Sequence, residues 1–188
     1  MYATLFPRTG ALALAALLLA GCGNLANVQS YSTPYSAPSG GETARLRVIT
    51  NGMARGVPPS ACIDWRREGA GVIAVAQSGF ANRNGQSLGM PPSRQAEQLG
   101  QGGFASSEVR IPAGQPFAFN FQSRGMVSSG YSYSCQQSMT FTPEAGQDYE
   151  LLLMESGQCL ARLVRLGDGR NLSGSLQDTR LCKASDAL

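Results

Sequence analysis

The stretch Tyr131-Ser-Tyr-Ser-Cys-Gln-Gln-Ser-Met-Thr-Phe-Thr142 is the clearest two-residue alternation in the chain. A period of two indicates a β-strand, because successive side chains of an extended chain point to opposite faces. One face of this strand would carry Tyr131, Tyr133, Cys135, Met139 and Phe141. Serine, glutamine and threonine fill the other face. The stretch therefore predicts an antiparallel strand with one buried face and one wet face.

Similar short patterns, separated by turn residues, run through the rest of the body. Strands are predicted at residues 44–50, 61–66, 71–77, 107–111, 117–122, 131–142, 149–154 and 159–166. A helical turn or two is expected only at residues 93–99. Short strands at regular spacing predict an all-β fold: a small antiparallel β-sandwich of immunoglobulin-like or transthyretin-like type, with a small β-barrel as the alternative.

The N-terminal region has the pattern of a secretory leader. Arg8 precedes an unbroken apolar run at residues 11–20. Ten apolar residues rise only about 15 Å as a helix, roughly half the hydrocarbon thickness of a bilayer. A permanent transmembrane helix is therefore not expected, and residues 1–21 are predicted to be a signal peptide.

The end of this leader, Leu19-Ala20-Gly21-Cys22, resembles the lipobox of bacterial lipoproteins. The resemblance implies that Cys22 becomes the first residue, carries diacylglycerol and palmitate-type acyl chains, and anchors the protein in a lipid bilayer. Gly23, in place of aspartate, implies sorting to the outer membrane, with the protein facing the periplasm. An ordinary signal peptide beside an incidental cysteine is the alternative.

A second resemblance covers residues 109–166. Val109-Arg-Ile-Pro-Ala-Gly114 and Phe141-Thr-Pro-Glu-Ala-Gly-Gln-Asp-Tyr149 look like a pattern of small uncharacterised proteobacterial envelope lipoproteins. Strand ends and turns make up both motifs, so they support the fold and no particular activity.

Without Cys22, an even set of four cysteines is left, as two disulfides in an exported chain require. We favour Cys135–Cys159, because strand 131–142 would pair with strand 149–155 and bring the two sulfurs to one end of a sheet. Cys62–Cys182 would then pin the C-terminal tail across the sandwich. A metal site is a poor alternative, because the chain has no histidine and no Cys-x-x-Cys motif. No cofactor is expected.

Composition divides the mature chain into three parts. Residues 22–43 are expected to be the lipidated cysteine and a flexible tether, with a reach of about 25 Å. Residues 44–166 would form the β-sandwich domain, and residues 167–188 a polar, disulfide-pinned tail. Within the domain, residues 78–104 contain few core-forming side chains and would be a long loop that is either functional or disordered.

The net charge and the possible catalytic motifs argue against several classes of function and assign none. The net charge of +3 is mild and the basic residues are not clustered, so nucleic acid is not an expected partner. Gly85-Gln-Ser-Leu-Gly89 matches a hydrolase elbow, but Ser87 has no histidine to activate it. Asp148 and Glu150 share one strand face, as in sugar hydrolases, although solvated charge beside a turn is the simpler explanation. No catalytic residue is assigned, and an enzyme is not expected.

The candidate binding residues are aromatic and arginine side chains, namely Trp65, Arg66, Arg67, Tyr131 and Tyr133. A tryptophan in the core, with exposed ion pairs around it, is the structural alternative at residue 65. The favoured function is a non-enzymatic lipoprotein that binds an envelope protein or stabilises an assembly. A glycan-binding or small-ligand-binding module is the alternative, and a carboxylate-dependent hydrolase is least favoured.

Overall fold

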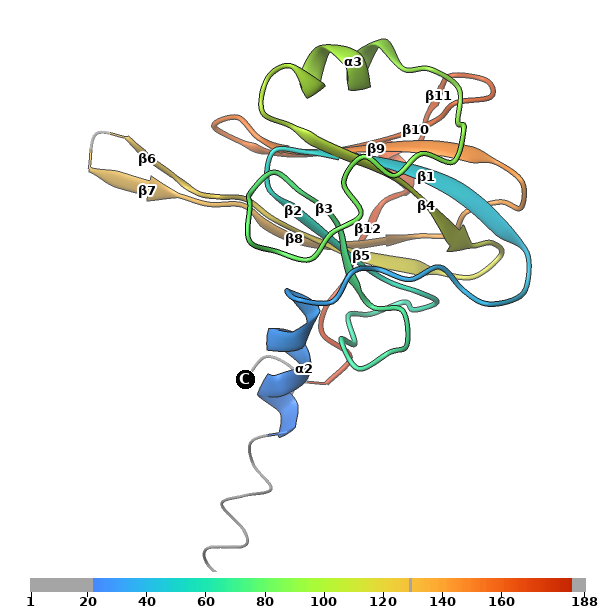
Figure 1. Ribbon diagram of the computed structural model, residues 1–188, viewed down its shortest axis with the longest axis horizontal. Coiled ribbons are helices and arrows are strands. Elements are labelled where there is room, and N and C mark those ends of the chain that lie inside the picture. The colour runs from blue at the N-terminus through green and yellow to red at the C-terminus, as the bar shows by residue number, and fades with distance from the viewer. Residues whose placement is uncertain (1–21, 129, 184–188) are drawn as a thin grey trace, which may run out of the picture.

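The computed structural model describes residues 22–128 and 130–183. Two five-stranded sheets pack face to face (Figure 1). The first, here the β1 sheet, has the order β11 (Arg170–Asn171), β10 (Cys159–Arg165), β9 (Asp148–Glu155), β1 (Thr43–Thr50) and β4 (Ala105–Pro112). The second, the β5 sheet, has the order β12 (Gln177–Asp178), β8 (Gln136–Phe141), β5 (Phe117–Gln122), β2 (Met53–Val57) and β3 (Gly71–Val75).

The all-β sandwich is therefore confirmed, and the sheets do not close into a barrel. Neighbouring strands are antiparallel except for β1 and β9, which run parallel. The parallel pair arises because the chain crosses from β8 in one sheet to β9 in the other. A short hairpin of β6 (Met126–Ser128) and β7 (Tyr131–Tyr133) extends beyond the sandwich (Figure 1).

The core lies between the sheets and follows the two-residue period. Strand β5 points Phe117, Phe119 and Phe121 inward, and strand β9 points Tyr149, Leu151 and Leu153 toward them. The rings of Phe141 and Tyr149 meet across the two sheets with centroids 5.6 Å apart. An edge-to-face pair of this kind contributes about 0.5–1.5 kcal/mol beyond its buried area.

The predicted strand at residues 131–142 is split in two. The break falls at Cys135, whose N–H donates to Ser123 Oγ at 2.8 Å while its carbonyl accepts from Ser123 N at 2.9 Å. Strand β8 then pairs with β5 and β12, so the expected pairing with β9 is wrong. The polar residues on both sides of the break let the first half leave the core as β7.

Both disulfides join the predicted cysteines, Cys62 to Cys182 and Cys135 to Cys159. The reason expected for the second pair was wrong. Cys135 immediately precedes β8 of the β5 sheet and Cys159 begins β10 of the β1 sheet, so this disulfide ties the two sheets together. The first pair closes a separation of 120 residues, and a loop of that size is worth about 4–5 kcal/mol in the chain-entropy model.

Residues 61–66 do not form the predicted strand. Ile63 makes only an isolated bridge to Leu181, and turns occupy the rest of this segment. Strand β2 was not predicted, because Arg55 and Gly56 interrupt the apolar pattern of Met53-Ala-Arg-Gly-Val57. It nevertheless lies between β5 and β3, where its neighbours supply the hydrogen bonds.

The flexible tether expected over residues 22–43 is also wrong. Helix α2 (Cys22–Ser30) begins this segment, and an extended stretch after it lies along the edge of β3. Tyr35 N donates to Val72 O at 2.9 Å, and Val72 N donates to Thr33 O at 2.8 Å. The Tyr35 side chain is 1% exposed and belongs to the core. Polar composition did not prevent order here, because the edge of β3 offers unpaired backbone groups that this segment satisfies.

Residues 78–104 are folded, and the disordered alternative is wrong. Arg83 and Asn84 bond to strand β3, and residues 88–91 lie over the outer face of the β1 sheet. The predicted helix is present as α3 (Arg94–Gly100), with Ser93 Oγ accepting from Ala96 N at its start. After β11, the tail makes the 3-10 turn η1 (Ser173–Ser175) and crosses to the β5 sheet as β12. None of the helices within residues 22–128 and 130–183 has the length and apolar character to span a bilayer. The predicted signal peptide, residues 1–21, lies outside the described residues.

The contact between β3 and the N-terminal segment leads to a first prediction. A Cβ added at Gly71 would lie 2.8 Å from the carbonyl carbon of Pro34 and 2.9 Å from the nitrogen of Tyr35. Both are backbone atoms, so Gly71→Ala should lower the free energy of unfolding by about 1–3 kcal/mol. Urea unfolding followed by circular dichroism measures this loss.

Gly40→Ala is the matched control, because nothing lies within 4 Å of a Cβ at that position. It should leave the unfolding midpoint nearly unchanged. Equal stability of the two variants would contradict the close packing of residues 33–35 on β3.

Candidate functional site

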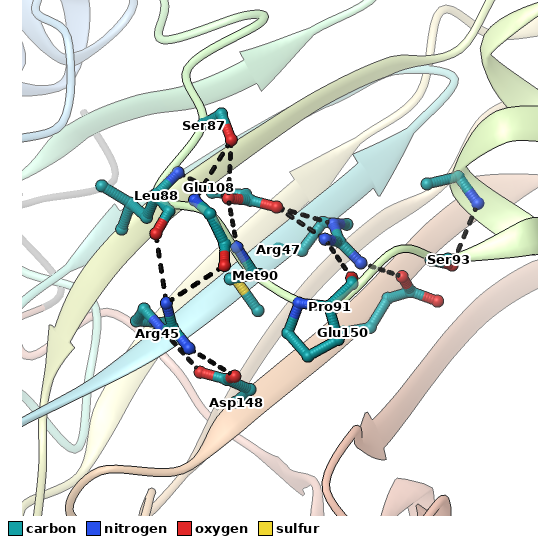
Figure 2. A network of polar contacts seen from close by, with 12 residues as sticks. Arg45, Arg47, Ser87, Leu88, Met90, Pro91, Ser93, Glu108, Asp148 and Glu150 are labelled. Atoms are coloured by element: carbon teal, nitrogen blue, oxygen red, sulfur yellow. Dashed lines mark hydrogen bonds and ion pairs between the residues drawn. The ribbon is translucent and has the colours of Figure 1, made fainter.

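A buried ionic network occupies the outer face of the β1 sheet (Figure 2). Strand β1 turns Leu46 and Val48 into the core, which directs Arg45 and Arg47 outward. Arg47 is 6% exposed and lies between two carboxylates from the flanking strands. Its Nη2 is 2.6 Å from Glu108 Oε1 on β4, and its Nη1 is 3.1 Å from Glu150 Oε2 on β9.

The segment at residues 87–91 covers this network on the side away from the core. Glu108 Oε2 accepts from Leu88 N at 2.5 Å and from Met90 N at 3.3 Å, while Arg47 Nη2 donates to Pro91 O at 2.7 Å. Burial by itself would raise the pKa of Glu108, but the N–H groups of Leu88 and Met90 and the Arg47 guanidinium together lower it. The carboxylate is therefore held in its charged form.

The residues considered for catalysis at the sequence level belong to this network. Asp148 receives two bonds from Arg45, at 2.6 and 2.7 Å, and Glu150 is paired with Arg47. Ser87 donates its hydroxyl to Glu108 at 3.3 Å. Each carboxylate has a cation bound to it, so the arrangement fastens the loop to the sheet. Across residues 22–128 and 130–183, no three acidic or cysteine side chains gather into a metal site.

A second buried arginine, Arg55, lies on the outer face of the β5 sheet. Two aromatic rings cover its planar guanidinium, with Cζ 3.9 Å from the ring centre of Tyr31 and 4.0 Å from that of Trp65. Its Nη1 donates to Asn27 Oδ1 at 3.2 Å and to Ser30 Oγ at 2.6 Å, both on helix α2. Its Nη2 donates to Asn120 Oδ1 at 2.9 Å. We call Arg55, Tyr31 and Trp65 the arginine cage.

A cavity of about 170 Å³ adjoins the arginine cage. It is lined by Asn27, Tyr31, Arg55, Ile63, Trp65, Asn120, Gln136, Ser138 and Leu181. No acidic side chain is among them, and Arg55 Nε has no hydrogen-bond partner among the described residues. Burial lowers the pKa of Arg55 to about 10, so the guanidinium remains charged at neutral pH.

The structure separates Trp65, Arg66 and Arg67. Trp65 is 8% exposed and turns into the arginine cage. Arg66 Nε pairs with Asp64 on the surface at 3.4 Å, and Arg67 Nη1 donates to Pro59 O at 2.7 Å beside a different cavity. A buried tryptophan next to exposed ion pairs matches the structural alternative, with the addition that Trp65 covers a charge.

Tyr131 and Tyr133 lie on the β6–β7 hairpin and do not line the Trp65 cavity. Tyr131 is 81% exposed and Tyr133 is 39% exposed. The hydroxyl of Tyr133 is 3.5 Å from Cys159 Sγ, which places it at the base of the hairpin beside the disulfide. The expectation that both tyrosines face a buried side of the strand is wrong, because β7 has no second sheet to cover it.

Sequence reasoning missed Arg55, Tyr31, Asn27 and Asn120. Tyr31 and Asn27 were in the expected tether, and Arg55 was outside every predicted strand. A single arginine inside the mostly apolar stretch Met53-Ala-Arg-Gly-Val57 was the one available signal for the buried charge. Nothing in the sequence indicated which rings would cover it, because they come from distant segments.

The Arg47 network yields a second prediction, on stability. Arg47→Met would leave Glu108 and Glu150 buried without their cation, and should lower the free energy of unfolding at pH 7 by about 3–5 kcal/mol. The lowered pKa of Glu108 means that its contribution is complete above the ordinary value of about 4.3 and is lost as the pH falls through the folded-state value. The difference between wild type and variant should therefore shrink at pH 3.

Urea unfolding at both pH values measures this change. Arg162→Met, at an exposed position of β10, is the control and should have a small effect at either pH. A deficit for Arg47→Met that is equally large at pH 7 and pH 3 would contradict the electrostatic explanation.

Residues 22–128 and 130–183 thus contain a network in which every carboxylate is paired with an arginine, a buried arginine without a carboxylate, and a hairpin with exposed tyrosines. No protein-family model matches the chain, and no curated protein matches it in sequence.

Proposed function

We propose that this protein is a non-enzymatic lipoprotein of the outer membrane that binds another envelope protein through the β6–β7 hairpin. The lipobox-like stretch that ends at Cys22 supports the anchor. The observation that carries the binding function is the hairpin, which extends past the edge of the sandwich (Figure 1). Its Tyr131 is 81% exposed to solvent.

A two-stranded hairpin outside a sheet is only marginally stable in water by itself. Here the Cys135–Cys159 disulfide and the Ser123–Cys135 hydrogen bonds fix its base. Its strands pair only with each other, so both outer edges keep backbone groups that a partner strand can bind. Tyrosine adds an apolar ring and a hydroxyl and is enriched among residues that dominate protein interfaces.

Helix α2 determines how the anchor would relate to the body. It begins at Cys22 and ends at Ser30, whose hydroxyl accepts from Arg55. Its nine residues rise only about 13 Å, so a lipidated Cys22 would hold the arginine cage near the bilayer. The hairpin projects in a different direction from α2 (Figure 1) and would be free to meet a partner.

The alternative of glycan or small-ligand binding has less geometric support. It required Trp65 and the tyrosines to act together, yet they lie in separate places. The Trp65 cavity, at about 170 Å³, is smaller than the roughly 300–1,000 Å³ typical of pockets that bury a drug-sized ligand. A hydrolase has the least support, because Asp148 and Glu150 are both bound by arginines.

Site-specific photocrosslinking in intact cells tests the hairpin. A photoreactive amino acid at Tyr131 should give a discrete protein adduct, because this side chain would face the partner. The same substitution at Leu160, which is 44% exposed on β10, is the control and should give little or none. Tyr133→Ala should reduce the adduct formed at position 131.

No adduct at position 131, or equal adducts at positions 131 and 160, would contradict a role for the hairpin. Oxidised cysteines in each variant, shown by resistance to thiol alkylation, verify that the protein has folded.

The anchor has its own test. Cys22→Ala should abolish incorporation of labelled palmitate and move the protein from the membrane fraction to the soluble fraction. Ser39→Ala, at another position in the N-terminal segment, should change neither. Retention of the label in the Cys22 variant would contradict lipidation at this residue.

A further inference from the structure

The two buried arginines differ in how their charge is compensated. Arg47 contacts two carboxylates, and Arg45 binds Asp148 with both Nε and Nη2. Arg55 is only 2% exposed, yet its hydrogen bonds go to two amide oxygens and one hydroxyl. A buried charge without a counter-charge is costly unless another group compensates it. The arginine cage supplies aromatic faces and neutral acceptors, but no negative charge.

The geometry of the cage limits how a ligand can approach. The rings of Tyr31 and Trp65 lie against the guanidinium, with their centres 3.9 and 4.0 Å from Cζ. The N–H groups of a guanidinium lie in its plane, so an acceptor must enter in that plane. A guanidinium has five N–H groups, and the acceptors on α2 and β5 take three of them. Nε, which binds a carboxylate in Arg45 and Arg47, has no partner here among the described residues.

The cavity beside the cage fits one chemical class. Its single charge is Arg55, so a monoanion would be neutralised there, whereas a phosphate would bring excess negative charge into a buried site. Gln136 and Ser138 line the same cavity and supply neutral polar groups. Ile63, Trp65 and Leu181 give it an apolar wall.

We propose that the arginine cage and its cavity bind a carboxylate carried on a short apolar stem. A planar carboxylate is the natural partner of the Arg55 fork, and the stem would lie against Ile63 and Leu181. The cavity volume of about 170 Å³ suits such a group and excludes a large ligand. A free small acid and an acidic group of a peptide share this chemistry.

The single tryptophan of the chain makes the test direct. Trp65 lies on Arg55, so occupancy of the cavity should change its fluorescence. Full-length protein in detergent would be titrated with butyrate, with its neutral isostere butyramide, and with inorganic phosphate, all at constant ionic strength. Butyrate should give a saturable change with a midpoint of about 1–10 mM, as a weak single-group contact would, and the other two should give none below 100-fold higher concentration.

Two variants test the residues. Arg55→Lys keeps a charge but loses the planar fork, and should weaken butyrate binding at least tenfold. Leu181→Phe should fill the cavity, leave the cage in place, and weaken binding to a similar extent. Arg170→Lys, on exposed β11 in the other sheet, is the control and should bind like wild type. Because Leu181→Phe leaves Arg55 in place, the proposal stays testable if Arg55→Lys does not fold.

Peptide titrations distinguish the source of the carboxylate. A capped peptide containing glutamate would be compared with the same peptide containing glutamine. Saturation by butyrate would support the proposal and assign the carboxylate to a free acid. Saturation by the glutamate peptide only would also support it and assign the carboxylate to a protein. Equal effects of butyrate and butyramide, stronger binding of phosphate, or no saturation by any carboxylate would overturn it.

Discussion

Burial of a guanidinium on each outer face of the sandwich is the constraint on which the rest of the structure depends. Both faces are covered by segments rich in polar residues. A few apolar side chains, among them Ala26, Leu181 and Met90, pack beneath these covers, and the arginines add polar bonds to that packing. On the β1 sheet, Arg47 bonds to strands β4 and β9 and to the loop carbonyl of Pro91. On the β5 sheet, Arg55 bonds to helix α2 and strand β5. Each arginine therefore fastens a polar segment to a sheet.

The two outer faces of the sandwich differ in function because the positive charges of their buried arginines are compensated differently. The Arg47 network places two carboxylates around one cation, and the backbone N–H groups of Leu88 and Met90 bond to the second oxygen of Glu108. In this network each carboxylate is already paired with an arginine. Arg55 relies on cation–π contacts, which contribute about 2 kcal/mol when desolvated, and on neutral oxygens. The Arg55 face is therefore the one whose buried arginine lacks a negative charge to compensate it.

The sequence predicted the elements whose residue pattern lies within a single segment of the chain. Strands β1, β5, β9 and β10 follow alternation or apolar runs that a single strand displays, and all four were predicted close to their observed bounds. Helix α3 was predicted from its composition and from the glycines that end it. Strand β2 and the path of residues 31–42 were missed, because their order comes from backbone pairing with β5 and β3 rather than from their own side chains. The cage was missed for the same reason, since Tyr31, Arg55 and Trp65 meet only after three separate segments have folded.

The sequence by itself determined the all-β class, the alternation that builds the core, and the even cysteine set, because these depend on residue type and spacing along one chain. It also carries the lipobox-like stretch from which an anchor is proposed. Only the tertiary structure decided that β8 pairs with β5, that Cys135–Cys159 joins two sheets, and that the N-terminal segment is ordered. These outcomes depend on which distant groups satisfy one another's hydrogen bonds and charges. The burial of Arg55 is the clearest example, because the sequence does not distinguish a buried arginine from a solvated one.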